Sequence, residues 1–394
     1  MSGERFALVA GGGTAGHLQP ALAIAEALVE DGHARESIEF VGSTHGQDRA
    51  ALGGRGFPFT LLPGRGIVRS LAPRAVEANL ASLGGLLVAC ARGFGVVIRA
   101  RPRVVVSVGG YASLPASLAA VVLGVPLVLV NVDAVPGAAN RLFGRFARAS
   151  AVGWAGNPLP RAVVTGTPVR AEITAVTHGG PQRRAARRML GMPPDRPTVA
   201  VFGGSLGARH LNQVVDDLVD RWKDRDDRSI YHIVGRRDWD GYADPGPPST
   251  APGPGAGPAP TDGSGLHLTR VPYEDRMAVV YTAADIAVCR AGAMTVAELA
   301  VAGVPSVLVP LPGAPGDHQT ANARVLEGAG AAVVMADELM DADRLAMVLD
   351  GLLGDPDRLG SMARAAASMG RSDAAAAGAR VVEANARTAA RGRR

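Results

Sequence analysis

The sequence predicts an α/β protein made of two doubly wound parallel-sheet domains that face a cleft. Two observations favour this class. Short apolar runs alternate with helix-like segments, and a strand, a glycine turn and a helix follow one another in both halves of the chain. The 394 residues are enough for two domains with a core each. Some runs, such as Val104–Val106, are apolar throughout, as expected of strands that helices cover on both faces.

The first domain is expected at residues 1–165. Proline and glycine then interrupt the alternation at residues 166–195, which we expect to be an interdomain linker. The arginine run of this linker, Arg183–Arg188, has the composition of a solvated helix face. Strands are expected at 6–10, 37–42, 103–108, 126–131 and 149–153, and helices at 19–31, 46–54, 73–100, 113–123 and 138–147.

The second domain is expected at residues 196–365 and repeats the alternation. Within it, residues 244–265 are rich in Pro, Gly and Ala. They cannot bury enough apolar surface to order themselves, so we predict a flexible insertion. Residues 366–394 are expected to form a C-terminal helix and tail. Strands are expected at 198–202, 229–234, 266–270, 285–288 and 306–309.

Charge and composition narrow the classes of function. The formal net charge of +5, carried mainly by arginine, suits an anionic ligand, nucleic acid or an anionic membrane surface. We expect no nucleic-acid partner, because the sequence has no zinc-ligand spacing, helix-turn-helix signature or aromatic-basic strand. The amino terminus enters a strand almost at once, so we expect no signal peptide. No apolar run reaches the roughly 18 residues that a membrane span needs.

The first glycine turn, Gly11–His17, follows an apolar strand and opens a helix. Such a turn points backbone N–H groups and a helix N-terminus at an anionic group, usually phosphate. His17 stands beside these N–H groups. Because a helix N-terminus disfavours the charged imidazolium form, we expect His17 to be a neutral ring that can act as a general base.

Two further glycine turns extend this pattern. Gly203–Arg209 opens the second half and is expected to bind phosphate in its own domain. Gly109–Tyr111 follows another strand of the first half. If it lies on the same sheet edge as the first turn, it enlarges one anion site at the carboxyl ends of the strands.

Two later segments carry groups that suit a nucleotide sugar. Ala293–Glu298 begins a helix behind an apolar strand, and Glu298 is placed to accept hydrogen bonds from ribose hydroxyls. We expect no metal ion, because Asp317 and His318 are adjacent and point apart, and no further ligands are apparent. A polar cluster at another helix start can hydrogen-bond sugar hydroxyls: Asp317, His318, Gln319 and Asn322.

In this order the motifs resemble glycosyltransferase family 28, two-domain transferases of bacterial peptidoglycan synthesis with the GT-B fold of two Rossmann-like halves. The match covers most of the chain, and the motifs are specific jointly rather than singly. It rests on Gly12–His17, Gly109–Tyr111, Gly166–Arg170, Gly203–Arg209, Ala293–Glu298 and Asp317–Gln319.

The resemblance implies an inverting transferase that uses no metal or other cofactor. It would move N-acetylglucosamine (GlcNAc) from UDP-GlcNAc to the 4-hydroxyl of the muramoyl sugar of lipid I, an undecaprenyl-pyrophosphate carrier, to give lipid II. It also implies a peripheral location on the cytoplasmic face of the cell membrane, in contact with anionic lipid. Cell-wall synthesis or division proteins are implied as partners.

Carried over residue by residue, the resemblance makes His17 the catalytic base. On the donor side, Arg170 and Ser205 would lie near the diphosphate, Glu298 on the ribose, and Gln319 and Asn322 on the GlcNAc hydroxyls. The start of the helix that carries Glu298 would also contact the donor, through Ala293, Met294 and Thr295. The residues implied for the acceptor and its pyrophosphate are Thr14, Ala15, Gly16, Gly109, Gly110, Tyr111 and Asp133.

The chain departs from the family pattern at three places. Val130–Asp133 replaces a usual His-Glu-Gln-Asn segment on the acceptor side, Thr167 replaces Asn, and Ala291 replaces Ser. The donor side is nearly intact. Three alternatives therefore stand beside lipid I transfer: a related transferase with another lipid-linked or glycolipid acceptor, a UDP-GlcNAc 2-epimerase, and an inactive cell-wall scaffold.

Segment 71–101 mixes apolar residues with arginines. This composition suits a helix that lies on an anionic bilayer. It suits equally a core helix whose arginines reach the solvent.

Overall fold

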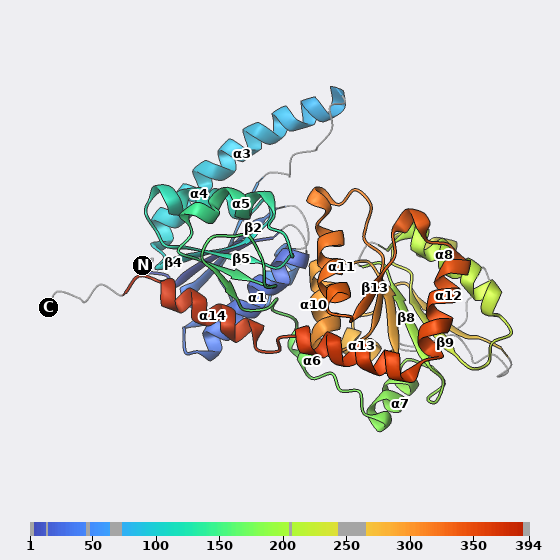
Figure 1. Ribbon diagram of the computed structural model, residues 1–394. Helices are drawn as coiled ribbons and strands as arrows, with labels where there is room; N and C mark the ends of the chain where they lie inside the picture. The colour runs from blue at the N-terminus through green and yellow to red at the C-terminus, as the bar shows by residue number, and fades with distance from the viewer. Residues whose placement is uncertain are drawn as a thin grey trace. The chain divides into compact units, whose positions relative to one another are not determined.

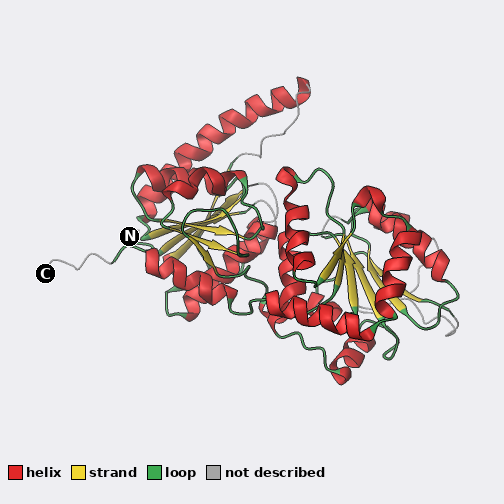
Figure 2. Cartoon of the chain, in the orientation of Figure 1, coloured by secondary structure: helices red, strands yellow, loops and turns green. Residues whose placement is uncertain are grey.

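The computed structural model describes residues 4–12, 15–44, 48–63, 73–204, 207–242 and 265–388. It divides the chain into two compact units. Unit 1 comprises Met1–Val169 and Arg371–Arg394, and unit 2 comprises Arg170–Gly370. Each unit holds one parallel sheet with helices on both faces (Figures 1 and 2). The predicted class of two doubly wound parallel-sheet domains is therefore confirmed.

The sheet of unit 1 has the strand order β3-β2-β1-β4-β5-β6-β7 in the part of the chain that is described. Every neighbouring pair is parallel. Two edge strands, β3 and β7, were not predicted. The bounds are β1 Ala7–Gly11, β2 Ile38–Ser43, β3 Phe59–Leu62, β4 Val104–Gly109, β5 Leu127–Asn131, β6 Ala149–Val152 and β7 Ala162–Val164.

The helices of unit 1 form two layers. In Figure 1, α1 and α14 cover one face of the sheet, and α3, α4 and α5 cover the other. The chain thus returns to unit 1 at its end, where His33 Nε2 and Glu383 Oε1 lie 2.8 Å apart. The bounds are α1 Ala15–Glu30, η1 Arg35–Ser37, α2 Asp48–Leu52, α3 Pro73–Ala100, α4 Ser113–Val122, α5 Ala138–Phe143, η2 Gly144–Phe146 and α14 Ala374–Asn385.

The sheet of unit 2 has the order β10-β9-β8-β11-β12-β13 among the described residues, again with parallel neighbours. Its edge strand β13 was not predicted. Most of the predicted insertion, residues 244–264, lies outside the described residues. The strand bounds are β8 Thr198–Phe202, β9 Ser229–Ile233, β10 His267–Val271, β11 Ile286–Cys289, β12 Ser306–Leu308 and β13 Ala332–Val334.

The helices of unit 2 also lie on both faces of their sheet. In Figure 1, α8 and α12 cover one face, and α10 and α11 cover the other. The bounds are α6 Ala171–Thr174, α7 Gly180–Met189, α8 Arg209–Trp222, η3 Trp239–Gly241, α9 Met277–Ala283, α10 Ala293–Ala302, η4 Pro315–Asp317, α11 His318–Gly328, η5 Asp337–Leu339, α12 Ala342–Leu353 and α13 Pro356–Met369.

In each sheet the first strands are added toward one edge and the later strands toward the other edge. The place where this direction changes is the topological switch point. In unit 1 the order turns between β1 and β4, and in unit 2 it turns between β8 and β11. In open α/β sheets a ligand binds outside the carboxyl ends of the strands at such a switch point, where neighbouring loops diverge and leave a crevice. The three glycine turns singled out in the sequence follow β1, β4 and β8, and Gly292 leads from β11 into α10.

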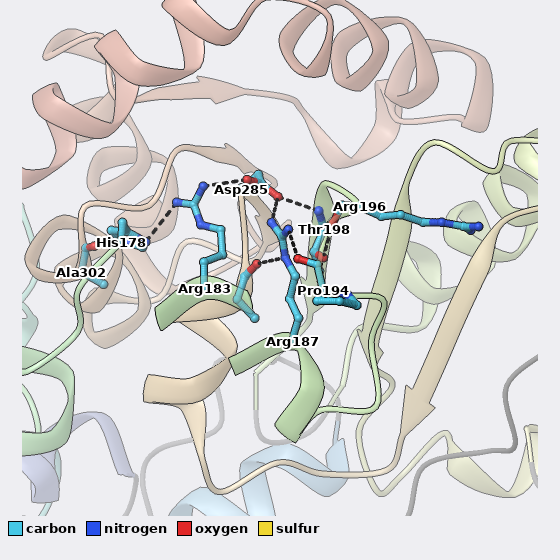
Figure 3. Close-up of polar contacts among 9 residues, drawn as sticks. His178, Arg183, Arg187, Pro194, Arg196, Thr198, Asp285 and Ala302 are labelled. Atoms are coloured by element: carbon cyan, nitrogen blue, oxygen red, sulfur yellow. Dashed lines mark hydrogen bonds and ion pairs between the residues drawn. The ribbon is translucent and has the colours of Figure 1, made fainter. Parts of the chain in front are cut away.

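The arginines of α7 differ from the sequence expectation of a solvated face. Arg183 and Arg187 both bind the carboxylate of Asp285, at 2.8 and 2.6 Å (Figure 3). Arg187 is only 5% exposed and also donates to the carbonyls of Ala283 and Pro194. The backbone N–H of Thr198 adds a third donor to Asp285 at 2.6 Å. This cluster fixes α7 to the sheet of unit 2, so the expectation is wrong for these two arginines.

Helix α3 has one packed side and one exposed side. Val96 and Val97 belong to the core of unit 1, and at Gly93 the helix meets Pro115 of α4 so closely that a Cβ would lie 2.8 Å from the proline Cβ. Leu87 and Ile98 remain 67% and 57% exposed. Within the described residues, no helix is both long and apolar enough to cross a membrane.

Candidate functional site

The turn after β8 brings backbone close to backbone. A Cβ on Gly203 would lie 2.5 Å from the backbone nitrogen of Ala208, and a Cβ on Gly207 would lie 2.6 Å from the carbonyl oxygen of Val234. Gly204 and Gly207 both have positive φ, at 88° and 78°. Only glycine fits these positions without strain. The turn leads directly into α8, so the first N–H groups of that helix lie at the switch point. Ser205 is outside the described residues.

The loop after β11 is held on both sides by side chains of α11. Gln319 Oε1 accepts from the N–H of Ala291 at 3.2 Å and from that of Leu311 at 3.0 Å. Asn322 Nδ2 donates to the carbonyl of Ala291 at 3.3 Å. Because two N–H donors fix the Gln319 carbonyl, the orientation of its amide is determined. These contacts hold the β11–α10 loop in the conformation that starts α10.

Gln319 and Asn322 therefore differ in what they can do. Gln319 is half-buried, and the two contacts above use only the carbonyl oxygen of its amide. Asn322 is 0% exposed and belongs to the loop support. The sequence placed both on the sugar hydroxyls; the structure buries the side chain of Asn322 fully and directs its Nδ2 at the carbonyl of Ala291.

The start of α10 faces the same switch point. Gly292 is its N-cap, with extended backbone, and Ala293, Met294 and Thr295 are half-buried in the first turn. A helix of this length presents unpaired N–H groups and a partial positive charge at its start. The first turn carries no acidic residue that would compete with an anion.

Glu298 lies one turn further along α10 and is buried, with 8% of its surface exposed. Its Oε2 accepts from the Tyr281 hydroxyl at 2.9 Å, and its Oε1 lies 3.5 Å from Nε of Arg170. Burial raises the pKa of Glu298 above the usual range of a carboxyl, and the contacts with Arg170 and Tyr281 oppose that rise only in part.

Arg170 connects the Glu298 carboxylate to α6 and to the loop between β10 and α9. Besides Glu298, its guanidinium contacts Glu172 at 3.2 Å and the carbonyl of Asp275 at 3.5 Å. The predicted donor residues Arg170 and Glu298 are thus direct neighbours. The phenol of Tyr281, which the sequence analysis missed, completes the group. An aromatic residue in α9, about 17 positions before its partner, gives no local signal of this contact.

In unit 1 the imidazole of His17 lies on the turn after β4. A Cβ on Gly109 would be 3.4 Å from His17 Nε2, and one on Gly110 would be 3.4 Å from its Nδ1. Both glycines have positive φ, at 95° and 77°. The structure therefore brings together three of the predicted acceptor-side residues at the β1/β4 switch point. Of the rest of the first turn, Gly16 is half-buried, the side chain of Ala15 is not described, and Thr14 lies outside the described residues.

Hydrogen bonds from two amide side chains hold Val130–Asp133, the segment that differs from the family pattern. Asn140 Nδ2 donates to the carbonyl of Val130 at 3.1 Å and to Asn131 Oδ1 at 3.0 Å, and Asn131 Nδ2 donates to the carbonyl of Asp133 at 2.6 Å. Val130 and Val132 are buried. Asp133 itself is half-buried at the end of the segment.

Two other residues line the same part of unit 1. Tyr111 follows the glycine turn, and burial raises the pKa of its phenol above the usual value. Asp48, which the sequence analysis missed, lies so close to Gly12 that a side chain there would overlap its carboxylate. Asp48 Oδ2 also accepts from the N–H of Ser43 at 2.8 Å. Its only sequence signal is a carboxylate soon after the second strand.

No group of three or more His, Cys, Asp or Glu side chains that could hold a metal ion occurs in the portion of the chain that is described. The groups that the structure places at the two switch points include backbone N–H groups, amides, the His17 imidazole, and the buried carboxylate of Glu298 with Arg170 beside it.

Comparisons with known proteins identify the family and the fold. The model of the glycosyltransferase family 28 N-terminal domain matches residues 7–152, and that of the family 28 C-terminal domain matches residues 198–377. The solved structure of MurG from Acinetobacter baumannii is similar with a TM-score of 0.72 and 27% identity, covering 97% of this chain and 99% of that one. This likeness confirms the predicted GT-B fold.

Two curated relatives carry the same printed name, UDP-N-acetylglucosamine–N-acetylmuramyl-(pentapeptide) pyrophosphoryl-undecaprenol N-acetylglucosamine transferase. The protein from Alkalilimnicola ehrlichii is 39% identical over 375 residues, covering 95% of this chain and 97% of its own. The protein from Desulforudis audaxviator is 36% identical over 371 residues, covering 92% and 94%. By these matches to family models and full-length relatives, the chain belongs to glycosyltransferase family 28.

Proposed function

We propose that the protein transfers GlcNAc, with inversion, from UDP-GlcNAc to the 4-hydroxyl of the muramoyl sugar of lipid I, and so makes lipid II. The relatives named for this reaction match nearly the whole chain. The observation that carries the proposal is the unit 2 switch point. There a glycine turn, the start of α10 and the buried Glu298 converge at adjacent strands, which matches the diphosphate and ribose of a nucleotide sugar.

On the donor side, the backbone N–H groups at the starts of α8 and α10 stabilise the diphosphate as it leaves. Negative charge develops on UDP when the bond from its β-phosphate oxygen to C1 of GlcNAc breaks. Preorganised N–H donors stabilise that charge without a metal ion. Ser205 and Arg170 act beside them, Ala293–Thr295 line the diphosphate, Glu298 accepts from the ribose, and the NH2 of Gln319 donates to GlcNAc.

On the acceptor side, His17 is the general base. It takes the proton of the muramoyl 4-hydroxyl as the hydroxyl oxygen attacks C1 from the side opposite UDP. This attack on the far side inverts the configuration at C1. The glycines of the turn after β4 let the backbone approach the imidazole, because a Cβ on either would lie within 3.4 Å of its ring. The segment around Tyr111 and Asp133 is proposed to contact the acceptor and its pyrophosphate.

The carrier lipid places this reaction at a membrane surface, and α3 is the element suited to it. Its exposed Leu87, Val88 and Ile98 and the exposed Arg92 combine apolar contact with positive charge. A helix with such a face lies in the interface of an anionic bilayer. We therefore place the protein at the cytoplasmic face of the membrane as a peripheral protein. Cell-wall synthesis or division proteins are its proposed partners there.

Replacing Glu298 with glutamine is expected to raise the donor KM by about 10- to 100-fold, because the ribose loses hydrogen bonds to a charged acceptor. In the unaltered protein, the donor KM should also rise as the pH falls through the raised pKa of Glu298, since the protonated carboxyl accepts less well. Steady-state kinetics across pH measure both effects, and the glutamine variant should lose this pH dependence.

Glu172→Gln is the matched control, because Glu172 pairs with the same arginine and is exposed. Its donor KM should stay near that of the unaltered protein. An unchanged KM in Glu298→Gln would remove the ribose assignment.

The proposed reaction is tested by incubating the protein with radiolabelled UDP-GlcNAc and a lipid I analogue. Label in a lipid-linked product supports the proposal. Conversion of the donor to UDP-ManNAc would identify an epimerase instead. A folded protein that gives neither product would be a scaffold, and label transferred only to a different glycolipid would identify a related transferase.

A further inference from the structure

A series of hydrogen-bonded polar side chains lies beside the glycine turn of unit 2 and takes no part in the proposed reaction. Its members are His232 of β9, Asn212 of α8 and Asp238 of the loop after β9. His232 Nε2 lies 3.0 Å from Asn212 Oδ1, and Asn212 Nδ2 lies 3.0 Å from the carbonyl of Val234 and 3.4 Å from Asp238 Oδ2. His232 and Asn212 are both buried.

The protonation state of His232 follows from its burial and from its contact with Asn212. Burial lowers the pKa of His232 to about 3, so its ring is neutral at physiological pH. The Asn212 carbonyl can only accept, so the Nε2 of His232 must carry the hydrogen. That bond fixes the orientation of the Asn212 amide, which turns its NH2 toward Val234 and Asp238.

Among these three side chains, Asp238 is the one that lies beside the glycine turn. Its Oδ2 lies 3.2 Å from the position of a Cβ on Gly207, and its side chain is only 7% exposed. Arg237 and Arg209 both bind Oδ1, at 3.3 and 3.4 Å. The hydrogen bond from Arg237, supported by Arg209, holds the pKa of Asp238 below its usual range. The carboxylate therefore stays charged while α8 begins beside it.

We propose that Asp238 is a positioning residue for donor binding, which rests on the donor site proposed for unit 2. One of its oxygens binds the first residue of α8, and the other packs on Gly207 and binds the amide that also holds the end of β9. Asp238 thereby fixes the closing glycine of the turn and the first turn of α8 to the sheet. Those are the backbone groups that meet the diphosphate, so Asp238 acts on UDP without touching it.

The test compares Asp238→Ala with Asp240→Ala by calorimetric titration with UDP and by steady-state kinetics. Asp238 and Asp240 both line a cavity of about 400 Å³ beside the start of α8, and Asp240 is exposed, so it is a matched control. In Asp238→Ala we expect the Kd for UDP and the donor KM to rise about tenfold, while kcat changes by less than about twofold. Asp240→Ala should bind UDP like the unaltered protein.

A second variant, Asp238→Asn, guards against loss of folding. It keeps an oxygen for the Asn212 amide but loses the charge that the arginines bind, so its Kd should lie between the other two. Gly207→Ala disturbs the same contact, and its effect on the Kd should not add to that of Asp238→Ala.

The outcomes are distinguishable. If the unaltered protein binds UDP and folded Asp238→Ala and Asp238→Asn bind it equally well, the inference is wrong. The same holds if kcat falls while the donor KM stays constant. If the unaltered protein itself fails to bind UDP, the proposed donor site is wrong.

Discussion

Replacing His17 with alanine is expected to lower kcat for GlcNAc transfer by about 10²- to 10⁴-fold, the usual contribution of a general base. The imidazole lies against Gly109 and Gly110 at the switch point of unit 1, where the acceptor hydroxyl is proposed to lose its proton. Donor binding is proposed for unit 2, so the Kd for UDP should not change. Single-turnover kinetics with UDP-GlcNAc and a lipid I analogue, together with calorimetric titration of UDP, measure the two effects.

His33→Ala is the matched control for this experiment. His33 is in the same unit, stacks on Phe6 and pairs with Glu383, so the variant removes a histidine away from the glycine turn. Its kcat should stay near that of the unaltered protein. Unchanged turnover in His17→Ala would remove His17 as the base, and a large change in UDP affinity would place it on the donor side instead.

Replacing Asp285 with alanine is expected to lower the free energy of unfolding by about 3–5 kcal/mol, because a buried cation loses its partner. Arg187 would keep only carbonyl partners, and the N–H of Thr198 would lose its acceptor. For a unit of this size, such a loss lowers Tm by roughly 6–20 °C. Differential scanning calorimetry at neutral pH measures it, with the transition assigned to unit 2 by its shift on adding UDP.

The control for this prediction is Asp343→Ala. Asp343 is 77% exposed and pairs with Arg221 on the surface, so its loss should cost less than about 1 kcal/mol. If Asp285→Ala shifts Tm no more than Asp343→Ala does, then the cluster in Figure 3 does not contribute to stability as described.

The central strands could be predicted from the sequence because burial on both faces leaves a continuous apolar run. The predicted strands agree with the structure to within one residue at each end. Three edge strands were missed: Phe59–Leu62, Ala162–Val164 and Ala332–Val334. Each is only three or four residues long, so its apolar residues are too few to distinguish a strand from a loop.

The candidate site was predictable where it depends on topology. The glycine turns follow strands whose order sets the switch points, so His17 and Gly109 meet as the sequence analysis expected. The partners of individual side chains on distant segments were not predictable. Arg187 gives the same local pattern whether it faces solvent or Asp285, and Asn322 gives the same pattern whether it binds a sugar or the carbonyl of Ala291. Only the packed structure distinguishes these alternatives.

Unit 2 is proposed to bind the nucleotide sugar at its β8/β11 switch point. A crystal structure with UDP-GlcNAc bound tests this most directly. We expect the diphosphate against the starts of α8 and α10, the ribose hydroxyls within hydrogen-bond distance of Glu298, and the NH2 of Gln319 on the GlcNAc. Nucleotide bound instead at the β1/β4 switch point beside His17 would contradict it.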